Sequence, residues 1–233
     1  MRARALLSWS SGKDSAWALH LLRQQGEVEV VGLLTTLNEV ADRVAMHAVR
    51  SELLQAQAEA VGLPLRTVGL PWPCSNEQYE AAMATAVERA KADGITVMAF
   101  GDLFLEDIRS YRIQKLANTG ISPLFPVWGI PTSDLARQMI AGGLRARLTC
   151  VDPKQLAGSF VGREFDAQLL AELPASVDPC GERGEFHTFT YDGPMFRHRV
   201  NVRGGAIVER DGFCFADLLP VGPRLPAKAK VLP

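Results

Sequence analysis

Short apolar runs and helical patterns alternate along the first half of the chain. Apolar runs of strand length occur at residues 5–9, 28–37, 65–70 and 97–100. Helical patterns lie between them at residues 14–25, 45–61 and 76–93, and each is followed by a glycine: Gly26, Gly62 and Gly94. This alternation predicts a parallel sheet with helices on both faces. Ligands of such sheets bind beyond the carboxyl ends of the strands, which here are the loops after residues 9, 37, 70 and 100.

The pattern changes near residue 130, after which Gly, Pro and turn residues become more frequent. A helix is predicted at residues 132–142, a strand at 146–151, and short antiparallel strands at 195–202, 206–209 and 213–216. Turns are predicted at Gly204-Gly205 and Asp211-Gly212. We therefore predict an α/β fold, with a parallel-sheet domain at residues 1–130 and a smaller α+β C-terminal domain at residues 131–233. The proline-containing last dozen residues are expected to form a loose tail.

Composition and charge narrow the class of protein. The apolar content of 47 % and the charged content of 22 % are typical of a globular chain with a core. A net charge of −1 provides no field that would attract nucleic acid. The four cysteines form no C-x-x-C pair, which argues against zinc fingers and disulfide scaffolds and favours buried thiols in a reducing compartment. With no apolar stretch of about 18 residues, a cytoplasmic protein without a membrane span is predicted.

The loop Ser10–Ser15 carries the clearest chemical signal. It lies between a predicted strand and a predicted helix, and its sequence is Ser-Ser-Gly-Lys-Asp-Ser. Small residues let backbone N–H groups approach an anion, the helix N-terminus adds partial positive charge, and Lys13 adds a full charge. The loop is not a Walker A motif, because Asp14 follows Lys13 where that motif has Ser or Thr. The alternative is an ordinary strand-to-helix turn capped by Ser or Asp.

This loop resembles the PP-loop of the N-type ATP pyrophosphatases, usually written S-G-G-K-D-S, with Ser11 in place of the first glycine. The resemblance implies an adenine nucleotide alpha hydrolase-like domain that binds ATP with Mg²⁺. Enzymes of that superfamily cleave ATP between the α- and β-phosphates. They adenylate a carbonyl or related oxygen, and a nitrogen or sulfur nucleophile then displaces AMP.

Two further stretches narrow the resemblance. They are Gly101-Asp102 to Arg112 with residues 124–128, and Asp178–Phe189 with residues 192–196. Together with the first loop they resemble the diphthine–ammonia ligase family from residue 5 to about residue 218. Arg183 stands where that family more often has Asn, and residues 106–109 resemble a branch common in bacteria, which lack the diphthamide-bearing elongation factor. The implied reactants are ATP, an acyl or carboxylate substrate left unidentified, and ammonia or an amine.

The predicted ATP-binding residues lie in several loops. They are Ser10, Ser11, Gly12, Lys13, Asp14, Ser15, Thr35, Met46, His47, Gly101 and Asp102. Lys13 is expected to face solvent or phosphate and to be catalytic. Asp102 follows a strand directly, where its carboxylate is expected to hold Mg²⁺, the alternative being the cap of a turn.

The predicted substrate and catalytic residues follow in the two other stretches. Arg109 and Arg112 lie three apart, on one face if a helix forms, and are expected to hold a substrate carboxylate or phosphate; a solvated face paired with acidic neighbours is the alternative. Glu182 is assigned to substrate binding, and Glu185 or His187 to the general base. These three residues are expected in a glycine-rich loop that folds over the sheet edge and faces the Ser10–Ser15 loop across a cleft. Internal bracing of that loop is the alternative. Phe125 and Trp128 are expected in the core.

Two other functions stay open from the sequence. One is a nucleotide sensor in which ATP holds a conformation without adenylation. The other is tRNA sulfur transfer, which the isolated cysteines and the net charge argue against. The sequence leaves homo-oligomer formation open.

Overall fold

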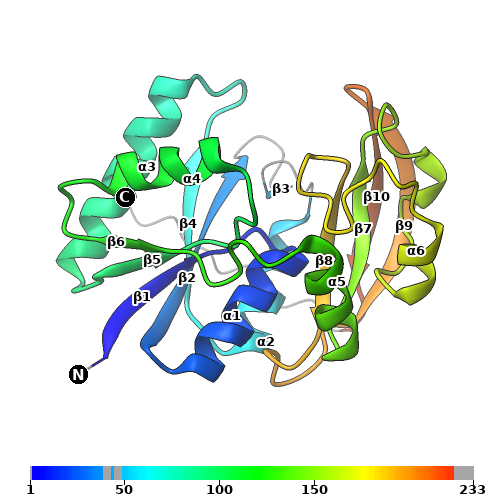
Figure 1. Cartoon of the computed structure of the whole chain (residues 1–233). Coiled ribbons are helices and arrows are strands. Elements are labelled where there is room, and N and C mark those ends of the chain that lie inside the picture. Colours follow the sequence, from blue (N-terminus) through cyan, green and yellow to red (C-terminus); the bar gives the residue numbers. More distant parts are fainter. Residues whose placement is uncertain (1, 39–42, 45–48, 223–233) are drawn as a thin grey trace.

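The computed structural model describes residues 2–38, 43–44 and 49–222, and these form two sheets that lie side by side (Figure 1). Five strands of the first sheet are parallel, in the order β4 (Leu65–Leu70), β2 (Val28–Asn38), β1 (Ala3–Ser8), β5 (Val97–Ala99) and β6 (Ser122–Leu124). A two-residue strand, β3 (Arg43–Val44), pairs antiparallel with the end of β2. The predicted α/β fold with a parallel sheet is confirmed.

Helices cover both faces of this sheet. The core on one face includes α1 (Lys13–Gln25) and α2 (Ser51–Val61), and the core on the other includes α3 (Asn76–Ala92) and α4 (Glu106–Leu116). Adjacent β1 residues serve opposite faces, Leu7 in the first core and Leu6 in the second. The chain runs from β1 outward to β2 and β4, and then crosses back to β5. The strand order therefore reverses between β1 and β5, which is where open α/β sheets bind ligands.

The second sheet is antiparallel. Its order is β8 (Phe186–Asp192), β7 (Arg145–Val151), β10 (Phe213–Pro220) and β9 (Val202–Arg210). The helices α5 (Thr132–Ala141) and α6 (Ala167–Glu172) and the 3₁₀ turn η1 (Gly158–Phe160) accompany it. Figure 1 shows α1 and α5 between the two sheets.

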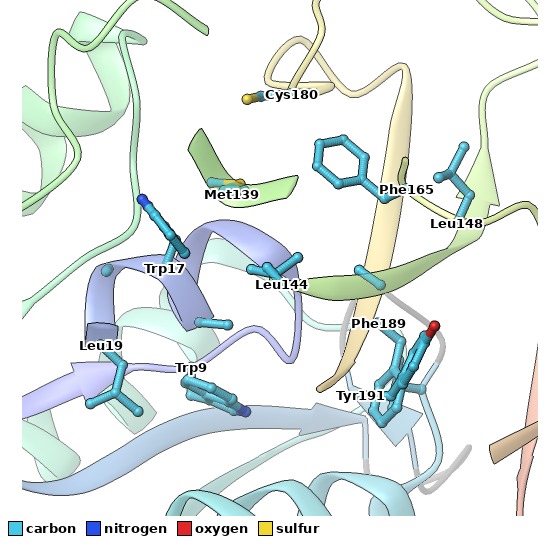
Figure 2. Close-up of a cluster of buried hydrophobic side chains, with 14 of the residues drawn as sticks. Trp9, Trp17, Leu19, Met139, Leu144, Leu148, Phe165, Cys180, Phe189 and Tyr191 are labelled. Carbon is cyan, nitrogen blue, oxygen red and sulfur yellow. The ribbon is translucent and has the colours of Figure 1, made fainter. Parts of the chain in front are cut away.

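One apolar cluster joins the two sheets. Trp9 and Trp17 from the first half pack in the same buried cluster as Phe165, Phe189 and Tyr191 from the second half (Figure 2). All five side chains are at most 5 % exposed. Burial of this size and continuity is the main source of stability for both halves.

Several predicted boundaries were wrong. Residues 195–201 are not a strand, and Gly204-Gly205 lie inside β9 rather than in a turn, because the strand continues through both glycines to pair with β10. The second helix begins at Ser51 rather than Ala45; residues 45–48 lie outside the described residues, as does most of the predicted tail. The turn at Asp211-Gly212 is confirmed. The strands β6 and β8 and the helix α6 were not predicted, whereas α4 does form. No helix in the described ranges is long and apolar enough to cross a membrane.

Candidate active site

The phosphate-loop candidate, Ser10–Ser15, lies where the strand order reverses. It follows β1 and runs into α1, while Gly101 follows β5 on the neighbouring strand. A Cβ atom on Gly101 would lie 2.9 Å from the backbone nitrogen of Ser15 and 3.0 Å from the carbonyl carbon of Asp14. The chain after β5 therefore packs directly on the first turn of α1, and only glycine fits there.

Hydroxyl groups close the loop on itself. The Ser10 and Ser15 hydroxyl oxygens are 3.1 Å apart, the Gly12 N–H donates to Ser10 Oγ at 3.3 Å, and Ser15 Oγ donates to the Gly12 carbonyl at 3.1 Å. Ser11 has a φ of 69°, in the left-handed region that favours glycine. Its hydroxyl is buried and has no hydrogen-bond partner in the described part of the chain. The loop is thus shaped before any ligand binds, at the positive end of a helix.

The second sheet holds this loop from behind. The Thr190 N–H donates to the Ser11 carbonyl at 3.0 Å, and the Lys13 N–H donates to Thr188 Oγ1 at 3.1 Å. The fully buried Gln57 of α2 donates to the carbonyls of Ser11 at 2.9 Å and Thr190 at 2.5 Å. Gln57 also accepts from the indole N–H of Trp9 at 2.9 Å.

Sequence reasoning missed Gln57, Thr188 and Thr190. The two threonines stand in the run Gly184–Thr190, whose alternation of small polar and aromatic residues was a usable strand signal. Gln57 carries no signal of its own, because one glutamine on a helix is ordinary.

Lys13 is buried, so of the two expected positions, facing solvent or facing phosphate, the first is wrong. Its side chain is 2 % exposed, and Nζ donates to Asp14 Oδ2 at 2.9 Å and to the Cys180 carbonyl. The ammonium group also lies 5.6 Å from the ring centre of Phe165 and 5.4 Å from that of Phe186. Burial is the largest single influence and lowers the pKa of Lys13, but the charge and hydrogen bond of Asp14, with Cys180 and Glu182, together raise the pKa above its ordinary value. Lys13 is therefore a charged group that joins the two halves.

The segment 178–185 lies against the same sheet edge. Glu182 Oε1 accepts the Leu103 N–H at 2.9 Å, in the loop after β5, and Cys180 contacts Lys13 as described. The expected proximity of this segment to the phosphate loop is observed. The two are in direct contact, however, rather than on opposite sides of a cleft.

Glu185 braces this segment from inside. The side chain is 1 % exposed, Oε1 accepts the Asp178 N–H at 2.8 Å, and Oε2 accepts the Arg183 N–H at 2.9 Å. Asp178 acts in the same way, accepting the Cys180 N–H at 2.9 Å and the Thr132 hydroxyl at 2.6 Å. Both oxygens of Glu185 are thus engaged, which matches the internal-bracing alternative.

Glu182 and His187 differ sharply in their protonation. Burial raises the pKa of Glu182 to about 7, and the charges of Asp14 and Asp102 act in the same direction. Burial lowers the pKa of His187 to about 4, and the charge of Lys13 adds to this shift. His187 lies in β8, not in the loop that was expected. Burial also raises the pKa values of Asp14 and Asp102, so Glu182 is one of three carboxyl groups at this edge whose pKa burial raises.

Asp102 and the two arginines lie around the start of α4. Asp102 Oδ2 is 3.5 Å from Arg112 Nε, and neither atom has a hydrogen-bond partner among the described residues. Burial raises the pKa of Asp102, and the charge of Arg112 opposes that shift. The Arg112 guanidinium lies 4.8 Å from the ring centre of Phe100. Arg112 therefore stands on an apolar platform beside the sheet edge.

Arg109 occupies a different position from Arg112. Its guanidinium lies 4.8 Å from the ring centre of Trp128 and 5.5 Å from that of Phe125, and its Nη1 is 3.5 Å from Glu106. Phe125 and Trp128 are half-buried beneath this arginine, and Phe125 packs against the core under α3 and α4, as expected for a core residue. The pairing of Arg109 with Glu106 matches the charged-face alternative.

The remaining predicted nucleotide residues are Thr35, Met46 and His47. Thr35 is buried at 3 % exposure, and its hydroxyl donates to the Trp9 carbonyl at 2.7 Å, so it ties β2 to the end of β1. Met46 and His47 lie outside the described residues.

Buried polar atoms that lack partners in the described part of the chain mark the edge where the two loops meet. Buried polar atoms without a hydrogen-bond partner in the described ranges gather at this edge, namely Ser11 Oγ, Asp14 Oδ1, Asp102 Oδ2 and Arg112 Nε. Buried polar groups are ordinarily paired, so a cluster of unpaired ones marks a ligand position. No group of three His, Cys, Asp or Glu side chains arranged to hold a metal occurs among the described residues. Asp14 and Asp102 each have one buried carboxylate oxygen without a hydrogen-bond partner among those residues.

Comparison with known proteins covers both halves. Residues 1–121 match the diphthamide synthase N-terminal domain and residues 131–216 match the diphthamide synthase C-terminal domain. The diphthine–ammonia ligase of Homo sapiens is 26 % identical over 241 residues, which cover 93 % of this chain and 88 % of the relative. That of Mus musculus is 28 % identical with the same coverage. The diphthine–ammonia ligase of Danio rerio is 27 % identical over 248 residues, covering 95 % and 93 % of the two chains.

Proposed function

Because the chain belongs to the diphthamide synthase family, we propose that it is an ATP-dependent ligase that forms an amide and releases AMP and pyrophosphate. The observation that carries this proposal is the direct contact between the Ser10–Ser15 loop and the segment 178–190. The loop offers hydroxyl and N–H donors at a helix N-terminus, and the segment offers an acid with a pKa near neutrality.

In the first step the Ser10–Ser15 loop holds the ATP phosphates. A carboxylate oxygen of the substrate attacks the α-phosphorus, the bond to the β-phosphate oxygen breaks, and pyrophosphate leaves. Mg²⁺ bound with the phosphates would neutralise their charge, with Asp14 and Asp102 as the carboxylates placed to hold it. Lys13 is a positioning residue, since its ammonium already binds Asp14 and the Cys180 carbonyl. It keeps the two halves in register around the reacting phosphate.

In the second step ammonia or an amine attacks the acyl carbon of the mixed anhydride. The bond from that carbon to the AMP oxygen breaks, and the attacking nitrogen loses a proton. Glu182 is the group we assign to accept it, because its pKa of about 7 suits proton exchange at neutral pH. Glu185 holds the segment that carries Glu182, and His187 stays neutral at the pH of the reaction.

The two other functions have less support. Sulfur transfer needs a thiolate, but burial raises the pKa of Cys150 to about 12 and raises that of Cys180 further above its ordinary range. A sensor has no use for a buried acid tuned to neutral pH beside the phosphate loop. The relatives are named as ligases, which agrees with the proposed reaction.

The reaction products test the proposal. Incubation with ATP, Mg²⁺, ammonium chloride and a panel of carboxylates is expected to release AMP and pyrophosphate in equal amounts, detected by chromatography and mass spectrometry. ADP as the main product would reject the ligase mechanism. Tight ATP binding with no AMP under any condition would favour the sensor.

A further inference from the structure

The helices α3 and α4 cover the face of the parallel sheet that is away from the second sheet (Figure 1). Side chains of both helices line a groove there. Of the 17 residues of α3 only Val87 and Ala90 are buried, so the first half of this helix does not lie flat on the sheet. Two adjoining hollows fill the gap, one of about 330 Å³ and one of about 150 Å³. Tyr79, Glu80, Tyr111 and Arg112 line both, so the hollows form one continuous groove.

The groove begins at the edge of the sheet where the candidate active site lies. Asn76 and Ile108, near the first turns of α3 and α4, line the larger hollow. Both helices start from the carboxyl ends of the strands that precede them. Arg112 connects the groove to the site, because its Nε lies 3.5 Å from Asp102, one residue beyond the glycine that packs on the phosphate loop.

The lining changes in character with depth. The smaller hollow has an apolar wall of Met83, Val87, Met98, Phe100 and Leu116, and the charged side chains Glu88 and Lys115 also line it. The larger hollow has two phenol side chains and one guanidinium group. Glu80, which lines both hollows, is paired with Lys115 at 2.7 Å. A ligand that matches both parts has an apolar body and one anionic end.

Arg112 is the group that would hold that anionic end. It stands over the ring of Phe100, and its Nε has no hydrogen-bond partner among the described residues. Asp102 faces this nitrogen as an ion pair at 3.5 Å, longer than an ordinary hydrogen bond, so an incoming carboxylate would share the guanidinium group with Asp102. A guanidinium group binds a carboxylate through paired N–H donors, and such contacts are stronger than neutral ones.

We infer that the groove between α3 and α4 binds the acyl substrate, a small organic carboxylate whose apolar body lies along Met83, Val87 and Met98 and whose carboxylate meets Arg112. This rests on the proposed function and adds the substrate's chemical class and its path to the site. The larger hollow alone is at the lower end of the size range of small-molecule sites. The substrate approaches the phosphate loop from the β5 side.

Methionine methyl groups report binding directly. In protein labelled with ¹³C-methyl methionine, hexanoate and 4-phenylbutanoate are expected to shift the NMR signals of Met83 and Met98. Met139 and Met195 lie in the other core and serve as internal controls. The matched amides, hexanamide and 4-phenylbutanamide, are expected to bind at least about tenfold more weakly, since they lack the charge. Equal shifts for acids and amides, or none at Met83 and Met98, would overturn the assignment.

A matched pair of variants separates the groove from the rest of the helix surface. Ala84 lines the smaller hollow and Ala81 is exposed outside the groove, both on α3. Ala84→Trp is expected to abolish the carboxylate-induced shifts, and Ala81→Trp to keep them. Arg112→Gln is expected to leave acid and amide binding equal. Unchanged carboxylate binding in Ala84→Trp would contradict the proposal.

AMP formation distinguishes failure of this inference from failure of the proposed function. If a carboxylate supports AMP release in wild-type protein and in Ala84→Trp alike, the groove assignment is wrong and the ligase stands. If carboxylates shift Met83 and Met98 but AMP never forms, the groove binds them and the ligase proposal fails. Loss of both binding and AMP release in Ala84→Trp alone supports the two together.

Discussion

Ser11 is an exception to the backbone rules, and it lies at the centre of the phosphate loop. It takes a left-handed conformation with φ of 69°, and its side chain is fully buried. A non-glycine residue in that region costs about 1–2 kcal/mol. The superfamily pattern has glycine at this position, so the local strain has a direct sequence explanation.

Two substitutions at this position separate strain from contact. Ser11→Gly and Ser11→Ala both remove the hydroxyl group, but only glycine relieves the left-handed backbone. We expect the free energy of unfolding of Ser11→Gly to exceed that of Ser11→Ala by about 1 kcal/mol in urea titrations. If the hydroxyl donates to phosphate, both variants bind ATP more weakly in calorimetry and to the same extent. Equal stability of the two variants would contradict the strained conformation.

Glu182 makes both stability and rate depend on pH. Its folded pKa of about 7 lies above the ordinary value of 4.5, so between these values the folded protein binds more protons than the unfolded chain. Its contribution to the free energy of unfolding therefore falls as pH rises from 4.5 to 7. His187, lowered from 6.5 to about 4, contributes with the opposite slope between those two values. The opposing contribution of His187 weakens above pH 6.5 as the unfolded chain loses that proton, so the Glu182 contribution is the larger of the two near pH 7.

The Glu182→Gln variant tests this assignment. We expect product formation in the wild type to rise with pH through about 7, and Glu182→Gln to lose that rise. Product formation should fall by about 10²–10⁴-fold, the usual effect of a general base, while ATP affinity in calorimetry is kept. The fall in stability that Glu182 contributes as pH rises toward 7 should also be lost in the variant, while the opposing contribution of His187 remains.

Glu185→Gln and His187→Ala are the comparison variants for the Glu182 prediction. Glu185→Gln keeps one acceptor oxygen for the brace, so its loss should be mainly of stability. If Glu182→Gln keeps the full pH–rate profile and His187→Ala loses it, the general base is His187 rather than Glu182.

At the scale of elements, the local sequence pattern was sufficient to predict a helix or strand that has the usual apolar periodicity and the usual end signals. The β–α alternation of the first half predicted the parallel sheet, because each strand is a continuous apolar run and Gly26 and Gly62 end the first two helices in left-handed conformation. The phosphate loop was predictable for the same reason. The small and charged residues of the loop, and the strand and helix on either side of it, can all be recognised from a short local stretch of sequence.

The second half was harder to predict because its glycines do different things. Gly181 and Gly184 have positive φ and turn the chain, whereas Gly204 and Gly205 are extended inside β9. Sequence alone gives these glycines the same signal. The burial of Lys13 was likewise unpredictable, since its partners Cys180, Phe165 and Phe186 are more than 150 residues away in sequence.

Gly101 tests the contact between the end of β5 and the start of α1. In Gly101→Ala the new methyl group would meet backbone atoms of Asp14 and Ser15, which cannot rotate away. We expect the free energy of unfolding to fall by about 1–3 kcal/mol, the cost of overpacking, and ATP binding to weaken as the helix start moves. Gly204→Ala is the matched control, because open space surrounds that position in β9. Equal stability of the two alanine variants in urea titrations would show that the contact is looser than described.

At the scale of the whole molecule, the two sheets share their interior. The cluster around Trp9 and Trp17 continues without a break to Phe189 and Tyr191 (Figure 2), and Gln57 and Lys13 add hydrogen bonds across the same boundary. The predicted boundary near residue 130 stays a prediction, and the packing of this cluster continues across it. The first half also has a core of its own under α3 and α4.

Shared packing leads to a prediction about cooperativity. We expect urea to unfold both halves in one transition, because opening either sheet exposes the cluster that stabilises the other. All four tryptophans lie within residues 1–130, so tryptophan fluorescence reports on the first half. The buried thiols Cys150, Cys180 and Cys214 lie in the second half, so their labelling by a thiol reagent, read by mass spectrometry, reports on that half. The half-buried Cys74 of the first half should react below the transition and serves as a reagent control.

The expected result is that the fluorescence and thiol-labelling transitions have the same urea midpoint and that ATP with Mg²⁺ raises both midpoints together. Labelling of the second-half thiols at a lower urea concentration than the fluorescence change would instead establish two independent domains.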